Sequence, residues 1–357
     1  MQYLVHTLER VPRQCVWEIT NRCNLRCVHC ECEAGDAHPE ELSTDEALAL
    51  ASDLAALGTE TVNLSGGEPL LRRDWPLIAE RLAEHGVAVH LVTNGLAFDQ
   101  RAARRCLDAG VRTVAISIDG PMATHDSIRR YPRGEGPSRF RRAYEALALA
   151  CSTGLSTVVI THINGRNQHE LAELHALLAL LPIGAWQLQL GCPQGRMLSA
   201  EPSYLVAPEA LPAIAQLVAD LQGKPFRILC TDDIGYYTEH EAHLRPLEAG
   251  SFPFFLGCYA GILGVAIESD GGIKGCPSLP SSLVDANVRQ RSLRDIWEDP
   301  ASFPYTRRFD ARKLRGFCRR CEFRRLCRAG CTSFALASTG SIYEDRHCLY
   351  RVQQCRS

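Results

Sequence analysis

Three cysteines near the start of the chain have the spacing of a metal-binding loop. Cys23, Cys27 and Cys30 follow the pattern C-x3-C-x2-C, so one short segment supplies three thiols. A structural zinc site closes with four protein ligands, whereas a cubane iron–sulfur cluster held by three thiolates leaves one iron open to a further molecule. Cys32 is a candidate fourth ligand, but it follows Cys30 too closely to reach around a cubane. The spacing therefore favours an iron–sulfur cluster, with a buried zinc knuckle as the alternative.

A second group of cysteines lies in the C-terminal part. The chain has 17 cysteines, and the densest group is Cys258, Cys276, Cys318, Cys321, Cys327, Cys331, Cys348 and Cys355. Disulfide frameworks belong to small secreted chains, so clustered thiols in a reduced compartment indicate metal. Four of these cysteines follow C-x2-C-x5-C-x3-C. Because C-x2-C is equally a zinc signature, a pair of zinc ribbons is the alternative here.

Between the two cysteine groups, short β-branched runs alternate with longer helical stretches. The predicted strands are 15–20, 61–64, 88–93, 113–118, 156–161 and 186–190, and the predicted helices are 44–57, 75–85, 100–109, 140–153, 168–181 and 208–222. Ser43 and Thr44 ahead of Glu46 predict a capped start for the first helix. Such alternation is typical of a parallel sheet wound by crossover helices. We therefore expect an α/β fold, a partial (β/α)6 TIM-like barrel.

Polar and glycine residues follow the predicted strands. The loop of Cys23, Cys27 and Cys30 follows the first strand and Ser65-Gly66-Gly67-Glu68-Pro69 the second, while Thr93-Asn94-Gly95 and Ser117-Ile118-Asp119-Gly120 end the third and fourth. In β/α barrels the chemistry lies on the loops at the carboxyl ends of the strands. We therefore expect these residues to share one rim, although Asn-Gly and Asp-Gly also form ordinary turns.

The combination of C-x3-C-x2-C after the first strand and Gly66-Gly67-Glu68-Pro69 after the second resembles the radical S-adenosylmethionine (SAM) superfamily. The resemblance implies a [4Fe–4S] cluster on Cys23, Cys27 and Cys30 whose open iron binds the amino and carboxylate groups of SAM. It implies reductive cleavage of SAM to methionine and a 5′-deoxyadenosyl radical, which abstracts hydrogen from the substrate. It also implies a flavodoxin or ferredoxin as electron donor.

The same resemblance assigns cofactor contacts. Gly66, Gly67 and Glu68 would receive the SAM amino group, and glycine is suited to this because it lets backbone approach a ligand and adopt positive φ. The contacts to the sulfonium and ribose would come from Asn94, Ser117 and Asp119. His29 stands where the family often has an aromatic residue, and the backbone there meets the adenine.

The C-terminal cysteines match the SPASM extension of radical SAM enzymes, which holds auxiliary iron–sulfur clusters. By this resemblance, one cluster takes the ligands Cys318, Cys321, Cys327 and Cys348. A second takes Cys258, Cys276 and Cys331, and its fourth ligand stays open, with Cys230 as a candidate. We expect a barrel over 1–225, a connector over 226–257 and a small cysteine-rich iron–sulfur domain over 258–357.

The members of this group differ in substrate. We expect oxidative modification of a ribosomally made peptide, with a separate leader-recognition protein, because Cys23 lies too close to the start for an N-terminal leader-recognition domain. The alternative is a small molecule such as a sugar or a tetrapyrrole side chain, because Val16 to Leu25 resembles the enzymes that trim haem precursors. Pro277 stands where sulfatase maturases carry a base carboxylate, and it cannot accept a proton. The catalytic acid or base is unassigned, with Cys192 after the sixth strand as a weak candidate.

Composition and charge limit the compartment and the partners that we expect for this protein. The chain has 357 residues, 39 Lys and Arg against 41 Asp and Glu, and no secretory signal pattern at its start, so we expect a cytoplasmic protein without a membrane partner. Ten basic residues between Arg307 and Arg328 are typical of nucleic-acid binding, but we expect them to support the clusters, since the overall charge is near zero. A non-catalytic iron–sulfur RNA-binding module is carried as an alternative of another class. His125, Asp126 and Arg129, which follow Asp119, predict a packed and salt-bridged loop.

Overall fold

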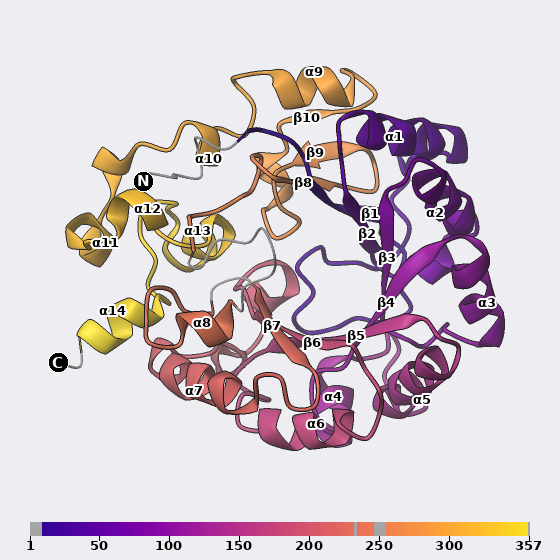
Figure 1. Cartoon of the computed structure of the whole chain (residues 1–357), viewed down its shortest axis with the longest axis horizontal. Coiled ribbons are helices and arrows are strands. Elements are labelled where there is room, and N and C mark those ends of the chain that lie inside the picture. The colour runs from indigo at the N-terminus through magenta and orange to yellow at the C-terminus, as the bar shows by residue number, and fades with distance from the viewer. Residues whose placement is uncertain (1–8, 232–233, 246–254, 356–357) are drawn as a thin grey trace.

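The computed structural model describes residues 9–231, 234–245 and 255–355. All six predicted strands are present, namely β1 (Gln14–Thr20), β2 (Thr61–Gly66), β3 (Ala88–Thr93), β4 (Val111–Ser117), β5 (Ser156–Ile163) and β6 (Ala185–Leu190). Consecutive strands pair in parallel, with Cys15 beside Val62 and Leu64 beside Leu91. The predicted α/β partial barrel is confirmed, and Figure 1 shows the helices wrapped around the outside of this sheet.

The sheet continues beyond the six predicted strands at both edges. The strand β7 (Arg227–Thr231) pairs in parallel with β6, within the range expected to be a connector. At the other edge β8 (Gly264–Ile267) pairs in parallel with β1, followed by the antiparallel strands β9 (Gly272–Lys274) and β10 (Ala286–Asn287). The order is β10-β9-β8-β1-β2-β3-β4-β5-β6-β7, so the C-terminal region is joined to the barrel through one sheet.

Helices follow the strands as predicted. They are α1 (Thr44–Ala56), α2 (Trp75–Glu84), α3 (Gln100–Asp108), α5 (Arg139–Ser152), α6 (Leu171–Leu178) and α7 (Leu211–Leu221), with the short α4 (Met122–Ile128) as an addition. The Ser43 side chain accepts from the Glu46 backbone N–H while the Glu46 carboxylate accepts from that of Ser43, which confirms the predicted cap. Trp17 and Ile19 of β1 are fully buried in one core with helix residues such as Leu54.

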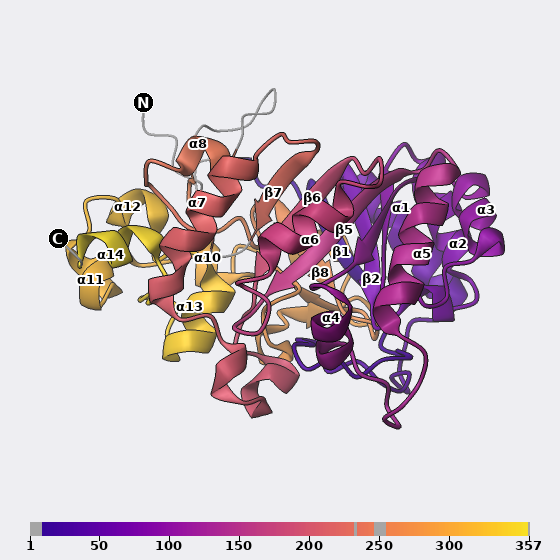
Figure 2. The same ribbon diagram turned by 90° about the horizontal axis from the view of Figure 1, so that it is seen from below.

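The remaining helices of the described chain are short. Four 3-10 helices lie in the barrel half, η2 (Pro69–Leu71), η3 (Gly195–Ser199), η4 (Pro202–Tyr204) and η5 (Pro208–Ala210). After β7 come α8 (Glu241–Leu244), η6 (Ser281–Leu283), α9 (Leu293–Glu298), α10 (Pro304–Arg307), η7 (Ala311–Lys313), α11 (Gly316–Arg320), α12 (Arg324–Cys327), α13 (Thr332–Thr339) and α14 (Leu349–Gln354). Figure 2 shows α11, α12 and α14 at one end of the molecule, with α2 and α3 at the other.

One apolar segment bears on the expectation that the protein has no membrane partner. Pro202–Leu221 is long and apolar enough, by length and composition alone, to cross a membrane. The segment consists of η4, η5 and α7, and α7 buries Leu211, Ile214 and Val218 in the main core. Such a core helix passes the same test, so the segment is weak support for a membrane span.

Candidate active site

The loop after β1 carries the three predicted thiols. The Cys23 Sγ accepts a hydrogen bond from the Leu25 N–H at 3.4 Å, and the Cys30 Sγ accepts one from the Ala34 N–H at 3.4 Å. Burial raises the pKa of Cys27 to about 12, and the nearby Arg129 guanidinium opposes this rise. A loop whose thiols receive backbone N–H groups and face a buried cation fits a thiolate-bound iron–sulfur cluster, since the ligands must bind deprotonated.

A second loop, after β6, holds the cysteine loop in place. The backbone N–H of Arg196 donates to the carbonyl of Cys30 at 3.1 Å, and its Nε donates to the carbonyl of Cys27 at 2.9 Å. A third hydrogen bond joins its Nη1 to the carbonyl of Ala34 at 3.0 Å. Gly195 adopts a φ of 52°, and a Cβ there would lie 2.4 Å from the Cys30 carbonyl oxygen. Only glycine allows this approach of the two loops.

Cys32 lies beside the predicted ligands. Its Sγ is 3.7 Å from the Cys30 Sγ and 3.8 Å from the Gly66 carbonyl oxygen. The hydrogen bond with Cys32 lowers the pKa of Cys30. The Cys32 Sγ therefore lies where it can share a hydrogen bond with the Cys30 Sγ.

The glycine pair after β2 is required by the protein backbone. A Cβ on Gly66, whose φ is 126°, would lie 2.2 Å from the Thr20 carbonyl oxygen, and one on Gly67 would lie 2.3 Å from that of Arg22. The Gly67 N–H donates to the Thr20 carbonyl at 2.7 Å, and the Glu68 N–H to that of Arg22 at 2.8 Å. The sequence analysis explained these glycines by the approach of a ligand, whereas the structure explains them by the approach of the cysteine loop to β2.

Glu68 links the ends of β2 and β3. Its fully buried carboxylate accepts from the Thr93 hydroxyl at 2.7 Å and from the Asn94 N–H at 2.8 Å. Burial raises the pKa of Glu68 to about 7, against the opposing effect of these hydrogen bonds. The Asn94 side chain donates to the Asn24 Oδ1 at 2.7 Å, so it reaches the cysteine loop, and Ser117 is buried at the end of β4. The rim residues of β1 to β3 therefore meet, as predicted.

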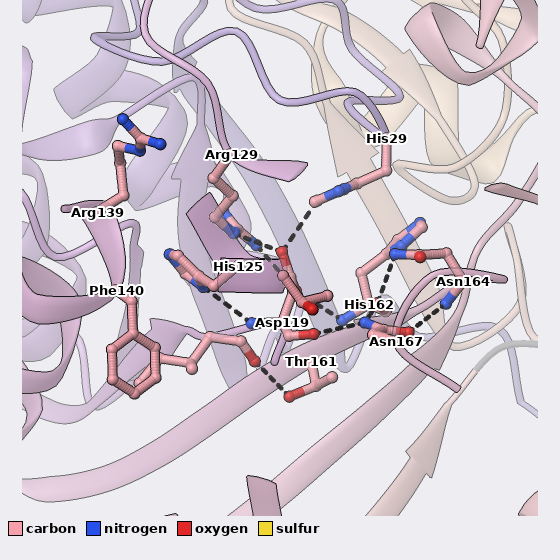
Figure 3. Close-up of polar contacts among 12 residues, drawn as sticks. His29, Asp119, His125, Arg129, Arg139, Phe140, Thr161, His162, Asn164 and Asn167 are labelled. Atoms are coloured by element: carbon pink, nitrogen blue, oxygen red, sulfur yellow. Dashed lines mark hydrogen bonds and ion pairs between the residues drawn. The ribbon is translucent and has the colours of Figure 1, made fainter. Parts of the chain in front are cut away.

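Asp119 lies at the centre of a buried polar network at the ends of β4 and β5 (Figure 3). The Arg129 Nε donates to Asp119 Oδ2 at 2.6 Å, and the His162 N–H donates to Oδ1 at 3.0 Å. His125 Nδ1 accepts from the Asp119 N–H at 3.1 Å. Burial raises the pKa of Asp119, but Arg129 and then His29 outweigh it and hold that pKa well below its usual range. The predicted salt-bridged loop is present, and Arg129 in this loop pairs with Asp119. The Asp119 carboxylate accepts hydrogen bonds from protein groups, and ribose binding by Asp119 stays a prediction.

His29 connects this network to the cysteine loop. Its ring stacks on that of His162, with centroids 4.1 Å apart and an angle of 19°, and its Nε2 is 3.7 Å from Asp119 Oδ2. Burial lowers the pKa of His162 to about 4 and that of His29 well below its usual value, so both rings are neutral at pH 7. Gly191 leaves room for His162, because a Cβ there would lie 2.5 Å from the ring. The sequence carried no signal for His162, which lies 133 positions beyond His29.

Glu18 is a half-buried acid that the sequence analysis did not single out. It lies on β1, on the face opposite to Trp17 and Ile19. Burial raises the pKa of Glu18 to about 7, and Lys274 on β9 opposes this rise. Lys274 pairs with Glu268 at 2.8 Å. The alternation of apolar and polar residues along β1 was the signal that could have identified Glu18. It places a carboxylate on the inward face of a barrel strand, where burying a charge is costly, so such a residue suggests a functional role.

Four C-terminal thiols converge on one pocket. Its lining includes Cys318, Cys321, Cys327 and Cys348, the four residues predicted to hold one auxiliary cluster. Tyr237, Phe317 and Tyr350 form aromatic walls, and Tyr237 stacks on Phe323 with centroids 4.3 Å apart. Four soft ligands around a partly apolar hollow fit an iron–sulfur cluster, and they equally suit the zinc alternative in donor type.

The remaining predicted ligands, Cys258, Cys276 and Cys331, do not line that pocket. Cys258 and Cys276 both lie near Tyr305, where they contribute, after burial and Asp285, to the raised pKa of its phenol. Cys331 occupies the position just before α13, and its Sγ is 3.1 Å from the Ser333 Oγ. Over 9–231, 234–245 and 255–355, no three His, Cys, Asp or Glu side chains are arranged to hold a single metal ion.

Two further thiols were singled out from the sequence, Cys192 as a catalytic candidate and Cys230 as a candidate fourth ligand. Cys192, just after β6, accepts from the Gln194 amide at 3.2 Å, and the same amide donates to the carbonyl of Ser278, two residues beyond Cys276. Cys230 lies on β7, and burial raises its pKa to about 12. Ligation by Cys230 and catalysis by Cys192 both stay predictions.

Two family profiles match separate parts of the chain. The family profile described as Radical SAM superfamily matches residues 17–178, and SPASM, described as an iron-sulfur cluster-binding domain, matches 258–322. The chain is 30% identical over 355 residues to the AdoMet-dependent heme synthase of Methanosarcina barkeri, covering 96% of this chain and 98% of that protein. It is 29% identical over 324 residues to the mycofactocin maturase MftC of Mycobacterium ulcerans, covering 88% of this chain and 81% of the maturase.

Solved structures share the fold. Streptococcus suis SuiB bound to S-adenosylmethionine superposes with a TM-score of 0.74 and 16% identity, covering 96% of this chain and 78% of SuiB. The protein anSMEcpe with bound AdoMet gives a TM-score of 0.73 and 15% identity, covering 96% of this chain and 92% of the other. At these identities the likeness shows the fold alone.

Proposed function

Because the chain belongs to the radical SAM superfamily and carries a C-terminal SPASM iron–sulfur domain, we propose that this enzyme oxidatively modifies a side chain of a tetrapyrrole. The observation that carries the choice of substrate is the end-to-end match to an AdoMet-dependent heme synthase, which covers 98% of that protein. A second relative from the same organism, an Fe-coproporphyrin III synthase, is 27% identical over 356 residues. The sequence analysis placed a peptide first, and these relatives favour its alternative.

The cysteine loop after β1 is the proposed site of SAM cleavage. A [4Fe–4S] cluster on Cys23, Cys27 and Cys30 would supply the electron that cleaves SAM to methionine and a 5′-deoxyadenosyl radical. Leu25 and Ala34 stabilise two thiolates through their N–H groups, and Arg196 fixes the carbonyl of Cys27. Glu68 ties the SAM motif of β2 to β3 through Thr93 and Asn94. These residues hold the ligands and the cofactor motif in fixed relation.

The auxiliary region is proposed to receive the electron that the substrate loses. The pocket of Cys318, Cys321, Cys327 and Cys348 supports one auxiliary cluster. Hydrogen abstraction followed by loss of one electron makes the overall reaction an oxidation, and SAM is consumed in each turnover. A product at the oxidation level of the substrate, formed with SAM regenerated, would contradict this proposal.

A peptide substrate is the second candidate. MftC, a mycofactocin maturase, is 29% identical, and one solved structure of SuiB holds the precursor peptide SuiA. A peptide substrate would require the separate leader-recognition protein that the sequence analysis expected.

The experiment that separates the two offers both substrates to the reconstituted holoenzyme. We expect an iron porphyrin with propionate side chains, iron coproporphyrin, to accelerate 5′-deoxyadenosine release and to lose mass in step with it. A precursor peptide encoded beside this gene should leave both quantities at the substrate-free rate. Acceleration by the peptide alone would overturn the tetrapyrrole proposal and support the second candidate.

A further inference from the structure

Seven exposed cations form a continuous stretch of the C-terminal region, which we call the basic rim. Its members are Arg312, Lys313, Arg315, Arg319, Arg320, Arg324 and Arg325, and all seven side chains are exposed. The acids nearest in sequence are Asp310 and Glu322. The sequence analysis expected these cations to support the clusters, but exposed charges are screened by water and act weakly on a buried group.

The basic rim adjoins the pocket of the four converging thiols, which Arg324 helps to line. Phe317, Cys321 and Arg324, from α11, α12 and the turn between them, line that pocket. A second hollow on the same helices is lined by Gly316, Phe317, Arg319 and Arg320. Figures 1 and 2 show α11 and α12 at one end of the molecule, far from α3 and α5 of the barrel. The proposed auxiliary cluster therefore lies just beneath a peripheral, positively charged surface.

The charge of the basic rim is largely unneutralised. In the described part of the chain, Arg312 is the one member with an ion pair, to Asp310 at 2.9 Å. The Glu322 carboxylate accepts a hydrogen bond from the Tyr350 hydroxyl, at 2.5 Å. The whole chain carries a formal net charge of −2, so this surface is a local departure from a balanced protein. Such a patch attracts an acidic partner and orients it on approach.

The aromatic residues beneath the rim argue against nucleic acid. Phe323 packs against Tyr237 and edge-on against Tyr350, with centroids 4.3 and 5.1 Å apart. Phe317 contacts Tyr350 in the same edge-on manner, at 6.1 Å. All of these rings are at least half-buried, so the surface offers no platform on which bases could stack.

We propose that the basic rim is the docking surface for an acidic one-electron carrier protein, which exchanges electrons with the cluster held by Cys318, Cys321, Cys327 and Cys348. This inference rests on the proposed function, because it needs that cluster and a supply of electrons. In turnover the cluster passes on the electron that it takes from the substrate: the neutral semiquinone of a flavodoxin gains this electron and becomes the anionic hydroquinone, and the cluster loses it. The test follows the reverse exchange, in which the anionic hydroquinone loses one electron to the oxidised cluster and becomes the neutral semiquinone. No proton moves and no covalent bond forms or breaks.

The test measures binding of an acidic flavodoxin to the holoenzyme, with a charge-reversal variant and a matched control. The variant combines Arg315→Glu, Arg319→Glu and Arg320→Glu, none of which lines the four-cysteine pocket. The control combines Arg101→Glu, Arg133→Glu and Arg141→Glu, three exposed cations of the barrel half. We expect the variant to raise the Kd of oxidised flavodoxin about tenfold or more and to flatten its salt dependence, with the control close to wild type. In stopped-flow experiments, formation of the semiquinone should be slower with the charge-reversal variant and close to the wild-type rate with the control.

Several outcomes would overturn the docking proposal. These are equal weakening by both triple variants, a wild-type Kd that does not rise with salt, or tighter binding of a single-stranded RNA than of flavodoxin at the same surface. Dithionite-driven release of 5′-deoxyadenosine should be unchanged in the variant, which shows that it is folded and loaded. If wild type fails with dithionite but still binds flavodoxin, the proposed function fails and the docking surface stands.

Discussion

The Nε of Arg196 donates a hydrogen bond of 2.9 Å to the carbonyl oxygen of Cys27, which lies 169 residues earlier in the chain. With two further hydrogen bonds to Cys30 and Ala34, this single side chain and its backbone join the loop after β6 to the cysteine loop after β1. The geometry of the proposed cluster site is therefore set by a contact across the barrel rim as well as by the cysteine spacing.

Replacing Arg196 by methionine should loosen the cysteine loop. Arg196→Met removes two charge-assisted hydrogen bonds to carbonyls, so we expect a loss of about 2 kcal/mol in the free energy of unfolding. The holoenzyme should also lose iron to a chelator faster than wild type, by about one cluster's worth. Arg294→Met, which removes an exposed pair with Glu298, is the control. Identical iron release in the two variants would show that Arg196 does not hold the loop.

The ion pair of Asp119 and Arg129 should dominate the stability of the β4 end. Asp119→Asn leaves Arg129 buried without its counter-charge, which costs about 3–5 kcal/mol. Thermal or denaturant unfolding of the holoenzyme measures this cost. Asp108→Asn, which breaks the exposed pair with Arg104, should cost less than about 1 kcal/mol. Comparable losses in the two variants would contradict the buried, water-excluded pair seen here.

Glu68 should make the stability depend on pH. Because the pKa of Glu68 rises from 4.5 to about 7 on folding, its contribution to stability is fully present below about pH 4.5 and is lost as the pH rises to about 7. Full loss corresponds to about 3 kcal/mol. We expect Glu68→Gln to flatten this slope by about half, since Glu18, whose pKa is also raised to about 7, keeps the rest. Urea unfolding across this pH range should give parallel curves for wild type and the exposed control Glu60→Gln; a parallel curve for Glu68→Gln would refute the assignment.

Cys230 is the candidate fourth ligand of the proposed cluster on Cys258, Cys276 and Cys331. If Cys230 is the ligand, Cys230→Ala should remove or shift the auxiliary-cluster signals in electron paramagnetic resonance and Mössbauer spectra. Cys192→Ala is the matched variant, because Gln194 links Cys192 to the Ser278 carbonyl near Cys276. Unchanged spectra in Cys230→Ala remove Cys230 from the ligand set and leave the site open or otherwise ligated.

The sequence predicted the parts of the fold that local patterns encode. The strands β1 to β6 have β-branched, alternating residues and clear helical partners, so their positions follow from the chain itself. The strand β7 follows Pro225 and has only five residues, and β8 and β9 are shorter still and each begin with a glycine. These strands are stabilised by pairing with β6 and β1, which no local pattern reveals.

The candidate site also has features that local sequence patterns predict and features that depend on tertiary contacts. Cysteine spacing predicted the cluster ligands, and the run containing His125 and Arg129 predicted a salt-bridged loop. The stacking of His29 on His162 and the hold of Arg196 on Cys27 join residues more than a hundred positions apart. Such contacts depend on how the strand ends meet at the rim, so sequence reasoning on a single chain does not reach them.

Release of 5′-deoxyadenosine is the measurement that tests the central claim most directly. The reconstituted protein with dithionite and SAM should release 5′-deoxyadenosine, and Cys27→Ala should abolish this release while its iron content falls by about one cluster's worth, because the C-terminal clusters use other thiols. Cys106→Ala, a buried core cysteine on α3, should keep both activity and iron. Retained SAM cleavage in Cys27→Ala, or none in the wild-type protein, would contradict the account.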